Sequence, residues 1–196
     1  MLPRIICLAV GYVCGLFQTS YIYGKRSGID IREHGSGNAG TTNALRTLGK
    51  KAGALTLLGD CLKCVLAVLI TRLLFGTHQG TDLLALELYA GAGCILGHNF
   101  PFYLKFKGGK GIAASVGLLL AFDIRIFPIC AVLFFATFFL THYVSLSSLL
   151  AYLGFLISVV TFGQMGMLDC TQPVLWEVYG LSAGLTILAY WRHRQN

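Results

Sequence analysis

Residues 126–144 read IFPICAVLFFATFFLTHYV, an apolar run that contains no Asp, Glu, Lys or Arg. A helix needs about 20 predominantly apolar residues to cross the hydrocarbon core of a bilayer. Because the apolar residues form long runs, membrane-spanning helices are favoured over the shorter, alternating strands of a barrel. Comparable runs lie at about 2–23, 52–75, 83–100, 111–122, 146–163 and 173–191. The sequence therefore predicts an all-α integral membrane protein, a polytopic bundle of about seven transmembrane helices within a range of five to seven.

The composition indicates the same class. Of the 196 residues, 56% are hydrophobic and 12% are charged, and the mean hydropathy is +0.71. A soluble domain carries about 25% charged residues, so this chain has too few charges to coat a water-facing surface. No long linker interrupts it, and we expect a single transmembrane domain over residues 1–196. The run at 2–23 lacks a small-residue cleavage site and is predicted to be a span, not a signal peptide.

The basic residues are concentrated on one side of the predicted bundle. The chain holds 15 Lys and Arg against 8 Asp and Glu, a formal net charge of +7. With seven spans, one side carries Lys25, Arg26, Arg32, Arg46, Lys50, Lys51, Lys105, Lys107, Lys110, Arg192 and Arg194. Because basic loops stay in the cytoplasm, we expect the N-terminus outside and the C-terminus in the cytoplasm. Anionic substrates and anionic lipids are natural partners of such loops, whereas nucleic acid is not expected.

Residues 35–46 read GSGNAGTTNALR, a glycine-rich polar segment that ends on an arginine. Glycine lets backbone N–H groups turn toward an anion, and hydroxyl and amide side chains add neutral donors. A helix beginning near Asn43 would direct its positive end at the same anion, and Arg46 would add a bidentate clamp. The candidate anion-binding residues are Ser36, Gly37, Asn38, Thr42, Asn43 and Arg46. From the residues alone, an ordinary flexible loop remains the alternative.

Residues 97–111 read GHNFPFYLKFKGGKG and lead into an apolar helix. The Lys-Gly-Gly-Lys-Gly run is expected to place ammonium groups and bare backbone N–H groups at the N-terminus of that helix, where anions are favoured. The candidate binding residues here are His98, Lys107, Gly108, Gly109, Lys110 and Gly111. The alternative is a basic interfacial loop that only sets topology, although the double glycine between lysines argues for a role beyond topology.

Three further features give only weak evidence of a functional role when each is taken alone. Ser145 and Ser148 open a predicted span, but serines in membrane helices commonly bond to their own backbone. Residues 192–196, RHRQN, form a basic end that contains His193 and Asn196. Asp60 and Lys63 lie inside the second predicted span at i,i+3 spacing, and we expect them to pair in a supporting role.

Glycines and cysteines inside the spans are interpreted as packing residues. Glycines at the four-residue spacing that lets helices approach closely are Gly11 and Gly15, and Gly93 and Gly97. Cys61 and Cys64 form a Cys-x-x-Cys pair, which in other settings indicates redox chemistry or zinc. This pair lies within a predicted span and no second pair stands at metal-ligand spacing, so we expect small buried hydrophobes and no metal.

The motifs match a known family in order and spacing. The matching elements are His34-Gly-Ser-Gly-Asn38 with Asn43 and Arg46, Gly97-His98 with Phe100-Pro101, Phe106-Lys-Gly-Gly-Lys-Gly111, Ser145-Leu-Ser-Ser148 and His193-Arg-Gln-Asn196. Over nearly its whole length the chain resembles the bacterial acyl-phosphate:glycerol-3-phosphate acyltransferases, the PlsY family. The resemblance implies a helical enzyme of the bacterial inner membrane with its motifs on the cytoplasmic side.

The resemblance also implies an activity and roles for residues. The family moves a fatty acyl group from acyl phosphate to the 1-position hydroxyl of glycerol 3-phosphate, giving lysophosphatidic acid and phosphate, the first acylation of bacterial phospholipid synthesis. No metal, cofactor or obligate protein partner is implied. The implied catalytic residues are Ser36, Arg46, Lys110, Ser148, His193 and Asn196. Binding or supporting roles are implied for Gly37, Asn38, Thr42, Asn43, His98, Lys107, Gly108, Gly109, Gly111 and Ser145.

The chain departs from the family pattern at a few positions. Thr41 stands where the family usually has alanine, and Gln195 where it usually has glutamate. Neither change removes a hydrogen-bond donor on which the interpretation depends. Family members usually continue past this element with a basic segment, whereas the sequence ends at Asn196, and we expect the adjoining carboxylate to weaken the contribution of Asn196.

The general base and the function class stay open at this level. His193 or an oxygen of a substrate phosphate would accept the hydroxyl proton. No cysteine or serine has a convincing partner base, so direct transfer is favoured over an acyl-enzyme. One alternative is an organic-phosphate transporter, although the internal repeat that transporters often show is not found. Another is a membrane protein whose basic loops only bind anionic lipid, which leaves the order of the motifs unexplained.

Overall fold

The computed structural model describes residues 1–77 and 83–194, and these residues are entirely helical apart from loops and turns. The elements are α1 (Leu2–Gly15), α2 (Thr19–Arg26), η1 (Ile31–Glu33), α3 (Thr41–Leu48), α4 (Lys50–Phe75), α5 (Leu83–Asn99), η2 (Phe102–Leu104), α6 (Ile112–Phe122), α7 (Ile126–Thr141), α8 (Val144–Gln164) and α9 (Gln172–His193). Each predicted apolar run coincides with one or two of these helices. The predicted all-α class is therefore confirmed.

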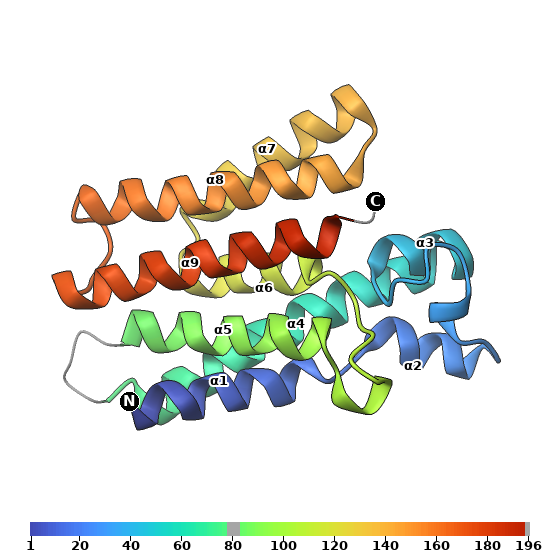
Figure 1. Cartoon of the computed structure of the whole chain (residues 1–196), viewed down its shortest axis with the longest axis horizontal. Coiled ribbons are helices and arrows are strands. Elements are labelled where there is room, and N and C mark those ends of the chain that lie inside the picture. Colours follow the sequence, from blue (N-terminus) through green and yellow to red (C-terminus); the bar gives the residue numbers. More distant parts are fainter. Residues whose placement is uncertain (78–82, 195–196) are drawn as a thin grey trace.

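The long helices lie side by side, with the N-terminus and the last turn of α9 at opposite ends of the bundle (Figure 1). We call the end formed by residues 24–51, 100–111, 142–148 and 192–194 the motif end, because it carries the polar motifs. Among the described residues, three segments are long and apolar enough to cross a membrane, judged by length and composition: Leu2–Arg26, Lys50–Phe75 and Val144–Gln164. The count of seven spans and their orientation stay predictions.

The first predicted span is not one continuous helix. The run at 2–23 is predicted to be a span, and the structure divides it: α1 ends at Gly15 and α2 begins at Thr19. A break exposes backbone carbonyl groups, and in an apolar bundle each needs a donor. The side chain of Gln18 donates to the carbonyl oxygens of Gly15 and His98 at 3.2 and 3.0 Å. The buried polar side chain of Gln18, which hydropathy alone does not single out, therefore stabilises the break.

Helices α1 and α5 pack through the predicted glycines, in a reciprocal arrangement. A Cβ atom on Gly11 would lie 1.9 Å from the carbonyl oxygen of Ala90, and one on Gly15 would lie 2.2 Å from that of Cys94. From the other side, a Cβ on Gly93 would lie 2.1 Å from the carbonyl oxygen of Leu8. Since the obstacles are backbone atoms, side-chain rotation cannot relieve these contacts. The predicted packing role of these glycines is confirmed.

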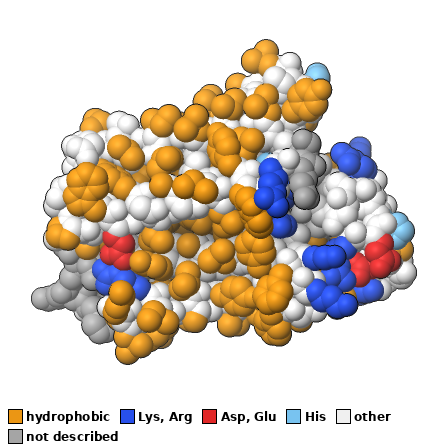
Figure 2. All heavy atoms as spheres, viewed as in Figure 1, with side chains coloured by type: hydrophobic (Ala, Val, Ile, Leu, Met, Phe, Trp, Pro, Cys, Tyr) orange, Lys and Arg blue, Asp and Glu red, His pale blue; other side chains and the backbone are white. Residues whose placement is uncertain are grey.

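Basic residues are distributed unevenly between the two ends of the bundle. Hydrophobic side chains cover most of the face seen in Figure 2, and Lys and Arg gather mainly toward the motif end. Three arginines that lie outside the predicted basic side each meet a carboxylate: Arg4 with Glu177, Arg72 with Glu87, and Arg125 with Asp123. The positive charge away from the motif end is therefore locally neutralised.

Replacing Gly93 by alanine tests the close approach of α1 and α5. We expect Gly93→Ala to lower stability by about 1–3 kcal/mol, because the backbones must move apart. Gly180→Ala is the matched control, since a Cβ there meets no atom within 4 Å. It should be neutral or stabilising by up to about 1 kcal/mol, as alanine favours helix. Thermal unfolding in detergent measures both, and equal midpoints for the two variants would contradict the packing account.

Candidate active site

A cavity of about 670 Å³ begins at the motif end and continues between the helices. Its polar lining comes from several separate stretches of the sequence, and includes Ser36, Asn38, Thr42, Asn43, Arg46, Asp60, His98, Lys110, Gly111, Ser145, Ser148 and His193. Its apolar lining comes mainly from α6, α7 and α8, and includes Leu118, Leu119, Phe127, Phe134, Ala151 and Phe155. The cavity thus suits a molecule with an anionic or polar head and an apolar tail.

The segment 35–46 is held in place by Asn43, the buried third residue of α3. Its amide oxygen accepts from the backbone N–H of Ser36 at 3.0 Å, and its amide nitrogen donates to the carbonyl oxygens of Ile31 and His34 at 3.1 and 2.9 Å. The turn needs a positive φ at Gly35, where a Cβ would lie 2.2 Å from that amide oxygen. Asn43 therefore shapes the loop that presents Ser36 to the cavity.

The two glycines at 108 and 109 have a different role from the one expected. Their backbone N–H groups were expected to be bare, but Gly108 donates to the carbonyl oxygen of Asn99 at 3.2 Å and Gly109 to that of His98 at 3.1 Å. A Cβ on either glycine would lie about 2.0 Å from an atom of His98. The expectation of free N–H groups was wrong here, because the loop folds back against the end of α5.

Lys107, Gly108, Gly109 and Gly37 lie outside the lining of the cavity, and Lys107 is exposed. Lys110, by contrast, lines the cavity just before α6. Burial, and to a smaller extent the nearby Arg192 guanidinium, lower the pKa of Lys110. Both effects disfavour its charged form. An anion bound beside it would offset them, so this ammonium is suited to binding a phosphate.

Arg192 connects the C-terminal helix to the glycine pair, a role that sequence reasoning missed. Its guanidinium donates to the carbonyl oxygens of Gly108 and Gly109 at 3.3 and 2.7 Å, and lies 5.2 Å from the ring centroid of Phe100. The sequence showed only a basic end, because contacts with residues more than 80 positions away leave no local pattern. Arg192 thereby fixes the end of α9, which carries His193.

His193 and Ser148 line the cavity from α9 and α8. Nδ1 of His193 lies 2.7 Å from the carbonyl oxygen of Ala189. A carbonyl oxygen only accepts, so Nδ1 carries the proton and Nε2 of the neutral ring holds a lone pair. The Ser148 hydroxyl donates to the carbonyl oxygen of Val144 at 2.8 Å, so its proton is engaged with its own helix.

The structure brings the motifs together, as their chemistry predicts. Five of the six implied catalytic residues line one cavity, namely Ser36, Arg46, Lys110, Ser148 and His193. Asn196, the sixth, lies outside the described residues. Asp60 and Lys63 form the predicted pair, with 2.8 Å between Nζ and Oδ1. Sequence reasoning gave Asp60 only a supporting role, but it also lines the cavity.

Comparison with known proteins identifies the family. The family model of glycerol-3-phosphate acyltransferase matches residues 5–196. The glycerol-3-phosphate acyltransferase of Clostridioides difficile (strain 630) is 49% identical over 146 residues, which cover 74% of this chain and 71% of that protein. Glycerol-3-phosphate acyltransferase 2 of Bacillus cereus (strain ZK / E33L) is 42% identical over 197 residues, covering 100% of this chain and 90% of that protein.

A solved structure has the same fold. The crystal structure of PlsY (YgiH), an integral membrane glycerol 3-phosphate acyltransferase, in its glycerol 3-phosphate form superposes with a TM-score of 0.84 at 29% identity, covering 98% of this chain and 89% of that one. The lysphosphatidic acid form gives a TM-score of 0.82 at 28% identity, with the same coverage of both chains. The chain therefore belongs to the glycerol-3-phosphate acyltransferase family of integral membrane proteins, as its motifs predict.

Proposed function

We propose that this protein transfers a fatty acyl group from acyl phosphate to the 1-position hydroxyl of glycerol 3-phosphate, releasing lysophosphatidic acid and phosphate. The observation that carries the proposal is the single cavity with a basic, polar end and an apolar remainder. Glycerol 3-phosphate is a small soluble anion, whereas acyl phosphate joins a phosphate to a fatty chain. A site for both must present positive charge where the two phosphates meet and an apolar channel for one chain.

The apolar part of the cavity is proposed to hold the fatty chain. Between Ile112 and Leu119, which both line the cavity, α6 advances about 10 Å at 1.5 Å per residue, so this wall extends well below the polar end. Phe127 and Phe134 of α7 and Phe155 of α8 line the same space. Burial of apolar area there, at about 25 cal/mol per Å², provides affinity for a donor that arrives from the bilayer.

The polar end is proposed to bind the two phosphates. Arg46 offers a planar guanidinium that matches phosphate oxygens, and Lys110 offers a compact ammonium. Ser36, Asn38 and Thr42 line the same end and add neutral donors. The positive charges of Arg46 and Lys110 offset the mutual repulsion of the two anions, and holding both in one place orients the hydroxyl toward the acyl carbonyl. The same groups stabilise the negative charge on the carbonyl oxygen and on the departing phosphate.

The proposed transfer is direct. The hydroxyl oxygen of glycerol 3-phosphate forms a bond to the acyl carbon, and the bond between that carbon and the phosphate oxygen breaks. The phosphate leaves with the electron pair. Nε2 of His193 accepts the hydroxyl proton, which its lone pair allows, and a phosphate oxygen is the other candidate base. Ser148 is proposed to contact substrate and not to form an acyl-enzyme, because its proton bonds to the backbone.

The remaining predicted roles follow from position. Asn196 is proposed to act next to His193, while Asn43 and the glycines of the two motifs shape the loops that carry the binding groups. The motif end is proposed to face the cytoplasm of the bacterial inner membrane, where soluble glycerol 3-phosphate is available. This placement agrees with the excess of basic residues at that end. No metal or cofactor is part of the proposed reaction.

Phosphate release tests the proposal directly. Purified protein in detergent, mixed with palmitoyl phosphate and glycerol 3-phosphate, should release phosphate and form lysophosphatidic acid. We expect Lys110→Ala to lower kcat/KM by about 10²–10³-fold, because a charged donor to the reacting phosphates is lost. Lys51→Ala, an exposed lysine at the same end, is the matched control and should retain activity. Turnover with acyl-CoA but not with acyl phosphate would contradict the proposed donor.

The lowered pKa of Lys110 predicts an alkaline limb in the activity profile. Deprotonation of Lys110 removes its attraction for phosphate, so kcat/KM for glycerol 3-phosphate should fall as pH rises, at a pH below the ordinary range for lysine. In Lys110→Arg the side chain stays charged, and the limb should move to higher pH. Rates corrected for spontaneous hydrolysis of the donor measure this effect. An identical limb in the wild type and Lys110→Arg would show that another group titrates.

Filling the apolar part of the cavity tests where the fatty chain binds. Ala131 lines the cavity from α7, whereas Ala136 of the same helix is exposed and lies outside the lining. We expect Ala131→Phe to raise KM for palmitoyl phosphate at least about tenfold relative to a short-chain acyl phosphate, because added volume displaces the distal chain. Ala136→Phe should leave the ratio unchanged. Equal effects of the two variants would place the chain elsewhere.

A further inference from the structure

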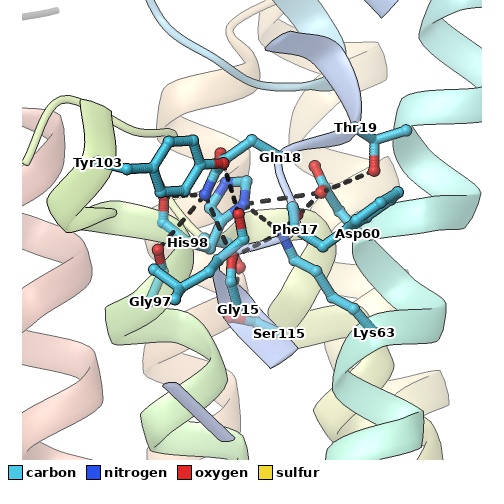
Figure 3. Close-up of polar contacts among 12 residues, drawn as sticks. Gly15, Phe17, Gln18, Thr19, Asp60, Lys63, Gly97, His98, Tyr103 and Ser115 are labelled. Atoms are coloured by element: carbon cyan, nitrogen blue, oxygen red, sulfur yellow. Dashed lines mark hydrogen bonds and ion pairs between the residues drawn. The ribbon is translucent and has the colours of Figure 1, made fainter. Parts of the chain in front are cut away.

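His98 is a buried histidine whose ring is held on one side by a buried lysine. Its side chain belongs to the end of α5 and the residue is 2% exposed. Nδ1 lies 2.8 Å from Nζ of Lys63, which is 5% exposed. The same ammonium reaches Oδ1 of Asp60 at 2.8 Å and the carbonyl oxygens of Phe17 and Gly15 at 2.7 and 3.3 Å (Figure 3). Lys63 therefore joins α4, α5 and the break after α1.

The partners of Lys63 determine which nitrogen of His98 carries the proton. Carbonyl and carboxylate oxygens accept hydrogen bonds, so they favour the charged ammonium. An ammonium has only donors, and Nδ1 of His98 must therefore accept from it. A ring that accepts at Nδ1 is neutral only with its proton on Nε2. The tautomer of His98 is thus fixed by Lys63.

The charges around His98 also oppose a second proton on its ring. Lys63 of α4 and Arg192 of α9 are positive and face it. Asp60 of α4 is the carboxylate nearby, with Oδ1 3.7 Å from Nδ1, but this oxygen is closer to Lys63, at 2.8 Å. These are the charged groups that face the ring from the described helices packed around it. Together they keep the imidazole neutral.

The other ring nitrogen of His98, Nε2, lies beside Gly109, where the lack of a side chain leaves room for the ring. A Cβ on Gly109 would lie 2.0 Å from Nε2 of His98, so any side chain there would collide with this nitrogen. His98 lines the same cavity as Lys110. Within residues 1–77 and 83–194, no hydrogen bond occupies Nε2. Gly109 thereby keeps an N–H donor uncovered at the polar end of the cavity.

We propose that His98 binds a substrate oxygen through its neutral Nε2–H, and that Lys63 is the positioning residue that fixes this tautomer. The inference rests on the proposed function for the identity of that substrate. A neutral imidazole donor stabilises a negatively charged oxygen without surrendering a proton readily. His193 has the opposite tautomer, since its Nδ1–H donates to Ala189 and its Nε2 accepts. The cavity thus presents one histidine that donates and one that accepts.

The tautomer is measured without any substrate. In protein carrying ¹⁵N-labelled histidine, the two ring nitrogens of His98 are assigned from a spectrum of His98→Gln. We expect Nε2 to be protonated and Nδ1 to be unprotonated from about pH 6 to 8, across the ordinary pKa of histidine. A proton on Nδ1, or a doubly protonated ring at neutral pH, would overturn the proposal.

The positioning role is measured with a paired variant. Asp60→Asn with Lys63→Gln removes both buried charges together and so avoids leaving one unpaired. We expect kcat/KM to fall at least about tenfold and a new acid limb to appear near pH 6.5, because His98 becomes free to titrate. The matched control, Arg72→Gln with Glu87→Gln, neutralises an ion pair that does not line the cavity and should change neither. Unchanged activity, or a loss without the new limb, would overturn the role of Lys63.

Conservative replacements of His98 separate a donor from a packing group. Glutamine carries an amide nitrogen near the position of Nε2, whereas asparagine carries one near Nδ1. We expect His98→Asn to lose about 10²-fold in kcat/KM and His98→Gln to lose clearly less. Equal losses would contradict the donor role. Wild-type protein that is inactive with acyl phosphate would overturn the proposed function instead, and the tautomer result would stand independently.

Discussion

The buried ammonium of Lys63 holds together the parts of the fold on which the site depends. A charge in an apolar bundle costs several kcal/mol unless its partners are all in place. Here they are the carboxylate of Asp60, the ring of His98 and the carbonyl oxygens of Phe17 and Gly15. These groups come from α4, α5 and the interruption between α1 and α2. Their relative positions are therefore tightly constrained.

The position of the loop that carries Gly108, Gly109 and Lys110 follows from that constraint. The carbonyl oxygens of His98 and Asn99 receive the N–H groups of Gly109 and Gly108, so the end of α5 sets the path of the loop. Lys110 comes next and α6 begins two residues later. A shift of α5 against α4 would therefore change the position of Lys110 relative to Arg46 of α3, which lines the same cavity. The break between α1 and α2 thus helps to position the residues that line the cavity, because its carbonyl oxygens bind Lys63.

The asymmetry of charge has more than one cause. Away from the motif end, the three arginines pair with carboxylates and add little net charge. At the motif end some basic residues support structure, as when Arg32 bonds to Asp30 and to the carbonyl oxygen of Leu104. Arg46 and Lys110 instead line the cavity. The basic residues at the motif end therefore differ in their surroundings: some hold loops in place, whereas others line the cavity.

The sequence predicted what depends on local pattern. Apolar runs mark the helices, the glycines at 11, 15, 93 and 97 mark a close helix contact, and the polar motifs contain many of the residues that line one cavity. It did not predict what depends on distant partners. The break after Gly15, the bonded N–H groups of Gly108 and Gly109, and the clamp from Arg192 all involve backbone groups. No residue type identifies such groups in advance.

The structure of this protein with lysophosphatidic acid bound tests the central claim most directly. The account predicts that the phosphate of the product lies within hydrogen-bond distance of Arg46 or Lys110, and that its acyl chain lies against Phe127, Phe134 and Phe155. A phosphate at the motif end with the chain on the outer surface of the bundle would contradict the account of the cavity. So would a product bound at the opposite end.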